Sequence, residues 1–166
     1  MDNGTSRCAP RIRRGQCLPD VHFITVDSQQ TSLSSFKGRY NLLLVATRNP
    51  DSPFLDALGR RQAEIAQRET VTIAFLACAQ EGALRARQRG GWPFLVVSGR
   101  DGSVTRRFGF VPQDALTVCI TDRWAEVFYI SNLPVSSGDA QVDECLNWLD
   151  FIEHQCPECF PSEWPD

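Results

Sequence analysis

Two short apolar runs lie in the first half of the chain, and the first of them contains no alternation of apolar and polar residues. They cover residues 42–46 (LLLVA) and residues 70–78 (TVTIAFLAC). Each run predicts a central strand of a sheet that lies between helices, because a strand with apolar side chains on both sides must be covered on both faces. Between the runs, Ser52 and Pro53 are typical of an N-cap and a first helical residue, and the spacing predicts a helix to about Arg68.

The rest of the chain adds further strands, a hairpin and a last helix. The expected elements are strands at 21–26 and 94–97, a helix at 80–89, a turn at 101–102, a hairpin of 116–121 with 126–130, and an amphipathic helix from 139 or 140 to about 155. Strands and helices alternate first and the hairpin follows, without an internal repeat. This order predicts a layered α/β domain with a mixed sheet.

Composition limits the class of protein. The 166 residues, 42% hydrophobic and 22% charged, suit one globular domain. A net charge of −3 argues against a nucleic-acid partner, and no apolar run is long enough to cross a membrane. The N-terminus has no apolar segment of the signal-peptide kind, and seven cysteines cannot all pair within one chain. We therefore expect a cytoplasmic protein with mostly reduced thiols.

The two ends differ in charge from the middle. Residues 1–14 form a basic N-terminal arm, residues 15–155 hold the expected domain, and residues 156–166 form an acidic tail. Solvated tails are the simplest interpretation of both ends. The opposite charges, and the cysteines that each end carries, lead to a second hypothesis. In it the arm lies beside the last helix and brings Cys8 or Cys17 close to the tail cysteines.

Several segments resemble, in chain order, the motifs of one redox family. Residues 15–23 (GQCLPDVHF) resemble the G-x-x-x-P-D-F opening of peroxiredoxins, with two extra residues, and residues 33–39 (LSSFKGR) resemble their L-S-x-F-K-G-K segment. Residues 92–109 and 120–127 resemble the F-P-L-L…D-x-x-G…Y-G run and the closing hairpin. Over residues 15–150 the chain is similar to the alkyl hydroperoxide reductase C and thiol-specific antioxidant group. This resemblance implies a thioredoxin-like fold, with a central mixed β-sheet and helices on both faces.

The resemblance also implies a peroxidase site at the start of the helix that follows the central strand. The family places a cysteine thiolate there, because helix-end N–H groups and a nearby arginine lower the thiol pKa. Ser52 falls at that cysteine, Asn49 at the family's threonine and Leu116 near its arginine, with Pro50 in the same pocket. A serine cannot form the sulfenic acid that the reaction needs, and Asp51 adds negative charge. We therefore expect a degenerate peroxidase site in which Ser52 is a helix cap.

The seven cysteines fall into three groups. Cys78, Cys119 and Cys145 lie in apolar patterns and are expected in the core, whereas Cys8 and Cys17 lie in or beside the basic arm. The sequence CPEC at Cys156 and Cys159 is the chain's C-x-x-C motif. Its spacing suits a redox dithiol, or half of a zinc site completed by Cys8 and Cys17, or a tail with two free or mutually bonded cysteines.

Two functions follow as hypotheses. The first is a thiol-dependent redox protein, of the antioxidant kind, in which Cys156 and Cys159 replace the chemistry missing at Ser52. The second is a non-catalytic redoxin-like domain that binds a partner or forms a homodimer, with a structural zinc at the cysteine-bearing ends as a variant. Neither needs an organic cofactor, and the partner expected for the first is a protein thiol or disulfide.

Overall fold

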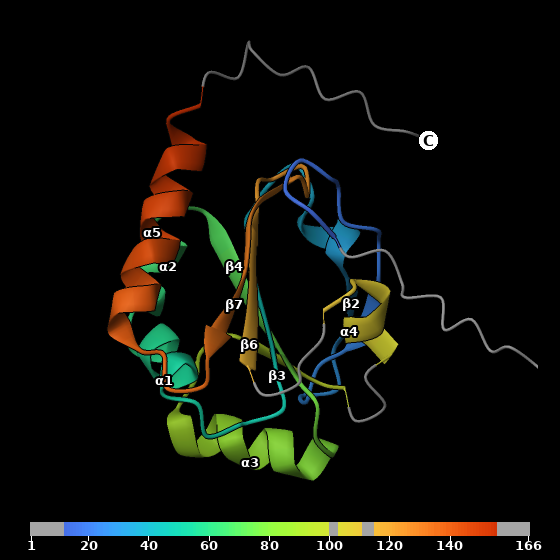
Figure 1. Cartoon of the computed structure of the whole chain (residues 1–166). Helices are drawn as coiled ribbons and strands as arrows, with labels where there is room; N and C mark the ends of the chain where they lie inside the picture. Colours follow the sequence, from blue (N-terminus) through green and yellow to red (C-terminus); the bar gives the residue numbers. More distant parts are fainter. Residues whose placement is uncertain (1–11, 100–102, 111–114, 156–166) are drawn as a thin grey trace, which may run out of the picture.

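The computed structural model describes residues 12–99, 103–110 and 115–155 (Figure 1). The strands are β1 (His22–Ile24), β2 (Gln30–Ser32), β3 (Asn41–Thr47), β4 (Thr70–Leu76), β5 (Leu95–Ser98), β6 (Ala115–Thr121) and β7 (Val127–Pro134). The helices are the 3-10 helix η1 (Leu33–Phe36), α1 (Pro53–Arg60), α2 (Gln62–Ala66), α3 (Gln80–Gly90), α4 (Ser103–Arg107) and α5 (Asp139–Glu153). The expected turn at 101–102 lies outside the described residues.

One mixed sheet lies at the centre of the described part of the chain, with the strand order β5-β4-β3-β6-β7. The central strand β3 runs parallel to β4 and antiparallel to β6, and each of its residues is buried. This confirms the prediction from the run 42–46. The strands β6 and β7 form the expected hairpin, and β1 joins the β5 edge through a bridge between Thr25 and Val97.

Helices and the β1–β2 hairpin cover the two faces of the sheet (Figure 1). On one face, α1, α2, α3 and α5 enclose a core around Leu43, Phe54 and Leu146. On the other face, η1, α4 and the hairpin enclose a second core around Phe23, Phe75 and Phe108. Trp92 and Phe94 stack at a centroid distance of 5.5 Å in the first core. No helix of the described residues combines the length and the apolar character of a membrane span.

The structure corrects the expected helix between the two central strands. That helix is divided at Arg61, where φ is −103° and ψ is 15°, into α1 and α2. The break directs the Arg61 guanidinium between Glu64 and Asp143 of α5. The strand β2 and the helix α4 were not predicted. β2 consists of three polar residues and α4 of only five residues, so neither is long enough to show a hydrophobic period.

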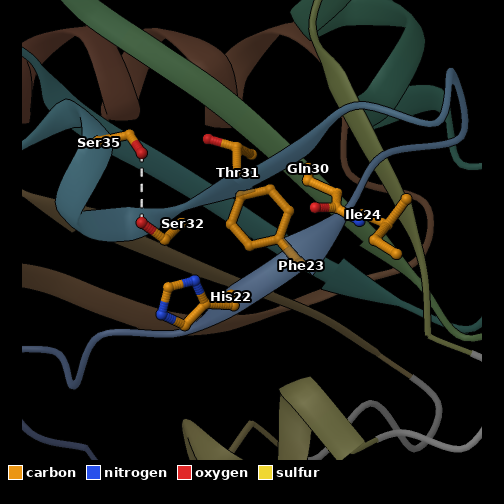
Figure 2. A pocket seen from close by; sticks show the side chains of 7 residues that line it. All are labelled: His22, Phe23, Ile24, Gln30, Thr31, Ser32 and Ser35. Carbon is orange, nitrogen blue, oxygen red and sulfur yellow. Dashed lines mark hydrogen bonds between the residues drawn. The ribbon is translucent and has the colours of Figure 1, made fainter.

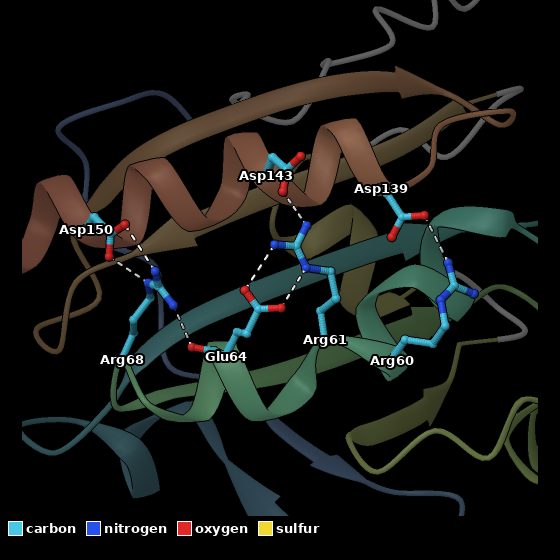
Figure 3. Close-up of polar contacts among 7 residues, drawn as sticks. All are labelled: Arg60, Arg61, Glu64, Arg68, Asp139, Asp143 and Asp150. Carbon is cyan, nitrogen blue, oxygen red and sulfur yellow. Dashed lines mark hydrogen bonds and ion pairs between the residues drawn. The ribbon is translucent and has the colours of Figure 1, made fainter.

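Arginines of α1, of the break between α1 and α2, and of the turn after α2 attach this helix pair to α5 (Figure 3). Arg60 bonds Asp139 at 3.1 Å, and Arg61 bonds Asp143. Arg68, which lies just before β4, bonds Asp150 through Nε at 2.6 Å and Nη2 at 3.1 Å. These contacts place the last turns of α5 at the amino end of β4.

Candidate functional site

Side chains within the loop between β3 and α1 organise its backbone. The backbone N–H of Asn49 donates to Thr47 Oγ1 at 3.1 Å, and that of Asp51 donates to Asn49 Oδ1 at 2.9 Å. The Asp51 carboxylate is paired with Arg89 from the end of α3. These bonds stabilise the loop conformation, and the carboxylate next to Ser52 has an arginine partner.

Ser52 is the N-cap of α1, as the sequence predicts. Its side chain is fully buried, and its Oγ accepts the Phe54 N–H at 3.2 Å while its carbonyl accepts the Leu55 N–H at 3.1 Å. Pro53 has no N–H. The first-turn N–H groups that would otherwise hold an anion are therefore occupied or missing.

The other expected pocket residues do not surround Ser52 with donors. Asn49 is exposed and Pro50 is half-buried in the same loop. Leu116 is fully buried at the start of β6, where its side chain joins the core shared with Leu55 and Val118. The arrangement at Ser52 supplies packing and helix capping, and its polar side chain already has a partner.

The described cysteines show environments that favour the protonated thiol. Cys119 and Cys145 are buried, and burial raises the pKa of both, that of Cys145 to about 12. Burial also raises the pKa of the half-buried Cys78. The predicted core positions of Cys119 and Cys145 are confirmed, whereas Cys78 is only partly covered. The candidate dithiol Cys156 and Cys159, and Cys8 of the candidate zinc site, lie outside the described residues.

Cys17 is exposed and lies beside the start of β7. Bonds of 2.8 Å join the backbones of Gly15 and Gln16 to Val127, and Cys17 forms a β-bridge with Glu126. Partial burial, then the negative charges of Glu126 and Asp122, raise the pKa of Cys17, although Lys37 opposes this effect. Cys17 is therefore an accessible thiol that stays protonated at neutral pH.

The described end of the basic arm reaches α5, a contact that sequence reasoning anticipated only as a hypothesis. The Arg14 guanidinium carbon lies 4.9 Å from the centroid of the Trp148 ring. Trp148 in turn contacts Tyr129 of β7, with a centroid distance of 5.5 Å. Arginine over an indole face is a favourable cation–π arrangement. The pairing of Arg14 with Trp148 leaves no signal in a single sequence, because the two residues are far apart in the chain.

A separate hollow of about 500 Å³ lies over the β1–β2 hairpin (Figure 2). Its polar side chains include His22, Ser32 and Ser35, and the two serine hydroxyls lie 3.2 Å apart. His22 is largely exposed, 3.8 Å from Asp20. The hollow contains no thiol, and within the described residues no group of three His, Cys, Asp or Glu side chains is arranged to hold a metal ion.

Comparisons with solved structures agree with this architecture. The chain is similar to peroxidoxin BcpB of Mycobacterium tuberculosis, with a TM-score of 0.74 and 14% identity over 86% of this chain and 99% of that one. It is similar to a Plasmodium yoelii Prx1a, modified at its N-terminus, that forms an artifactual octamer, with a TM-score of 0.70 and 17% identity over 91% and 96%.

A third similar structure is the Xanthomonas campestris bacterioferritin comigratory protein, described for its alkyl peroxide reduction activity. The TM-score is 0.67 and the identity 14%, over 79% of this chain and 90% of that one. No family model matches the sequence, and no curated protein matches it. The likeness in structure shows that the chain has the thioredoxin-like fold in the form that peroxiredoxins take.

Proposed function

We propose that this chain is a thiol-dependent redox protein in which the tail dithiol of Cys156 and Cys159 carries the chemistry. Two thiols would lose two electrons and two protons to form one disulfide. A hydroperoxide would accept them, its O–O bond breaking to give an alcohol and water. A thiol of a partner protein would then reduce the disulfide by exchange. The alkyl peroxide reduction named for the Xanthomonas neighbour supports this choice of oxidant.

The buried, hydrogen-bonded state of Ser52 is the observation that carries the proposal. We infer that Ser52 stands where peroxiredoxins have their attacking cysteine, because it caps the helix that follows the central strand. Its hydroxyl is enclosed and accepts the Phe54 N–H, so a substrate cannot reach it without breaking the cap. Leu116 supplies no charge there, which supports a degenerate site.

The state of the described cysteines supports a role for the tail. Cys119 and Cys145 are enclosed, Cys78 is half-buried, and partial burial together with two nearby carboxylates raises the pKa of Cys17. None of these thiols has the lowered pKa of an attacking group. The four are free, which also agrees with the proposal of a reducing compartment such as the cytoplasm.

The experiment compares turnover of an alkyl hydroperoxide and of a protein disulfide by the parent chain and by the Cys156→Ser, Cys159→Ser double variant. We expect the double variant to lose turnover and Cys78→Ser, the matched control, to retain it. The proposal is wrong if the double variant keeps the parent's rate. If Ser52→Ala loses the parent's turnover while the tail double variant keeps it, the reaction takes place at the N-terminus of α1 instead.

A second candidate is a non-catalytic binding or dimerisation domain. The exposed Ile24, Trp124 and Phe151 side chains favour it, since large apolar groups at a surface can serve a partner. A zinc ion held by Cys8, Cys17, Cys156 and Cys159 is the variant in which the ends are structural. Metal content of the purified full chain separates this variant from the redox proposal, because a zinc-bound dithiol is closed to oxidant until the metal leaves.

A further inference from the structure

The hollow over the β1–β2 hairpin has the composition of a site for an uncharged ligand. It is open to solvent, and its volume of about 500 Å³ falls within the ~300–1,000 Å³ typical of ligand pockets. Its lining comes from both strands and from η1 (Figure 2), and consists of His22, Phe23, Ile24, Gln30, Thr31, Ser32 and Ser35. Among these described residues there is no lysine, arginine, aspartate or glutamate, and His22 already lies 3.8 Å from the Asp20 carboxylate. The lining therefore offers hydrogen bonds and apolar contacts rather than ion pairs.

The lining combines an exposed apolar side chain with hydroxyl groups. Ile24 is 56% exposed, more than any other large hydrophobic residue of the described chain. Ser32 Oγ lies 2.7 Å from Ser34 Oγ and 3.2 Å from Ser35 Oγ. Three hydroxyls carry three protons, and these two contacts use two of them, so one proton remains available to an acceptor on a ligand. An apolar contact and a hydrogen-bond donor thus lie side by side.

The hydrogen bonds of the hairpin show which backbone groups of β2 point away from β1. The Leu33 N–H donates to the Val21 carbonyl at 3.1 Å, and the Thr25 N–H donates to the Gln29 carbonyl at 2.9 Å. In an antiparallel pair, residues whose N–H and C=O groups face the partner strand alternate with residues whose groups face away. Between positions 29 and 33 the odd-numbered residues therefore face β1, and the even-numbered residues face the other side.

The N–H groups of Gln30 and Ser32 and the carbonyl of Gln30 consequently lie on the outer edge of β2. No hydrogen bond joins these three groups to any other part of the described chain, in which β2 pairs with β1 alone. An unpaired strand edge is a template for another extended segment. Gln30 and Ile24 lie opposite each other on the hairpin (Figure 2). Because side chains alternate along a strand, every second side chain of an added strand would share this face and lie beside the hollow.

We propose that the hollow and the outer edge of β2 together bind an extended peptide of a partner protein, with an uncharged side chain at the position that enters the hollow. The peptide adds to β2 as a further strand, and its backbone exchanges hydrogen bonds with Gln30 and Ser32. Its uncharged side chain contacts Ile24. A small molecule in the hollow would leave the backbone groups of the edge unpaired. The site uses neither the tail cysteines nor Ser52, so it is independent of the proposed redox chemistry.

The test follows the backbone amides of the isotope-labelled full chain by NMR while capped hexapeptides are added. The first probe alternates threonine and valine, and the second alternates threonine and glutamate. The third is the first probe with methyl groups on its two central backbone nitrogens, which block both of its edges. We expect the first probe to shift the amides of Ile24, Gln30 and Ser32 saturably and to slow hydrogen exchange at Gln30 and Ser32. The other two probes should leave these amides unchanged.

Two variants test the edge and the hollow separately. Gln30→Pro removes the outward N–H and keeps the ladder bonds to β1, at an edge position where proline is tolerated. It should weaken binding of the first probe about 3- to 10-fold, the contribution of one backbone hydrogen bond. Gln30→Ala, the matched control, keeps this N–H and should bind like the parent. Ile24→Asp places a charge at an exposed position beside the hollow, so it should weaken the same binding with the melting temperature unchanged.

Several outcomes overturn the proposal. Equal binding of the N-methylated probe shows that the ligand does not add to β2, and equal binding of the glutamate probe excludes an uncharged ligand. Absence of a saturable shift at about 1 mM of the first probe refutes peptide binding. Slow exchange of the Gln30 and Ser32 amides in the protein alone assigns the edge to this chain itself. A second copy is then the occupant if the protection depends on protein concentration, and another segment of the same chain if it does not.

Discussion

Replacing Ser52 by cysteine will not create a rapid peroxidase. Ser52 is fully buried, and its Oγ accepts the Phe54 N–H at 3.2 Å. Sulfur is a weak acceptor, so Ser52→Cys loses most of the cap, which is worth ~1 kcal/mol. For a domain of this size that loss lowers the melting temperature by about 2–4 °C. Burial disfavours the thiolate, and the neighbouring Asp51, although it is paired with Arg89, adds negative charge.

Ser52→Ala is the matched control, because it removes the cap without adding a thiol. Thermal unfolding should show similar losses of stability in the two variants. Thiolate absorbance against pH should give Ser52→Cys a thiol pKa no lower than that of an ordinary cysteine, and peroxide consumption should stay at the level of Ser52→Ala. Fast peroxide consumption together with a strongly lowered thiol pKa would refute the reasoning and show that the pocket can still stabilise a thiolate.

Other predictions concern the ion pairs, Cys17 and a close contact. Hydrogen bonds from Arg68 hold the pKa of Asp150 below its usual value. Asp150→Asn should therefore lower the stability of the fold above pH ~4. The loss should be at most ~1 kcal/mol, because the ion pair is partly exposed. Denaturant titrations should show this loss disappear as the pH falls further, and an equal loss at pH 2 would contradict it. Glu126→Gln removes a charge that raises the pKa of Cys17, so iodoacetamide should alkylate Cys17 faster at pH 8, and a slower rate would exclude the electrostatic cause. Gly90→Ala places a methyl group against the Trp92 indole and should destabilise the fold by ~1–3 kcal/mol in thermal unfolding, whereas unchanged stability would mean that the indole moves freely.

Elements with a long apolar signal could be predicted from the sequence. The strand β3 buries each of its residues, and α5 buries Val142, Cys145 and Leu149 on one side, so each carries its own pattern. The N-cap at Ser52 could also be predicted from the local sequence, since a serine directly before a proline is typical of a helix start. The strand β2 and the helix α4 escaped because their stability comes from tertiary packing rather than from a pattern of their own.

The environment of the candidate site depends on contacts that no local pattern encodes. Arg89 reaches Asp51 from the end of another helix, and Glu126 comes beside Cys17 only when the opening segment pairs with β7. The direction of the Cys17 pKa therefore could not be predicted from its neighbours in sequence. The break at Arg61 could not be predicted from the local sequence either, because the partner of its guanidinium, Asp143, lies in α5.

The point at which the tail begins has a physical consequence for thiol chemistry on this scaffold. The N-terminus of α1, which would stabilise a thiolate, is already satisfied by Ser52, so reactive cysteines must find positive charge elsewhere. The tail begins after the C-terminus of α5, where the helix dipole and Glu153 disfavour a thiolate. The guanidinium of Arg14, held over Trp148 near that helix end, brings positive charge to the same place. The opening segment thus places a cation near the end of α5, in a part of the chain that a comparison restricted to the helix N-terminus would overlook.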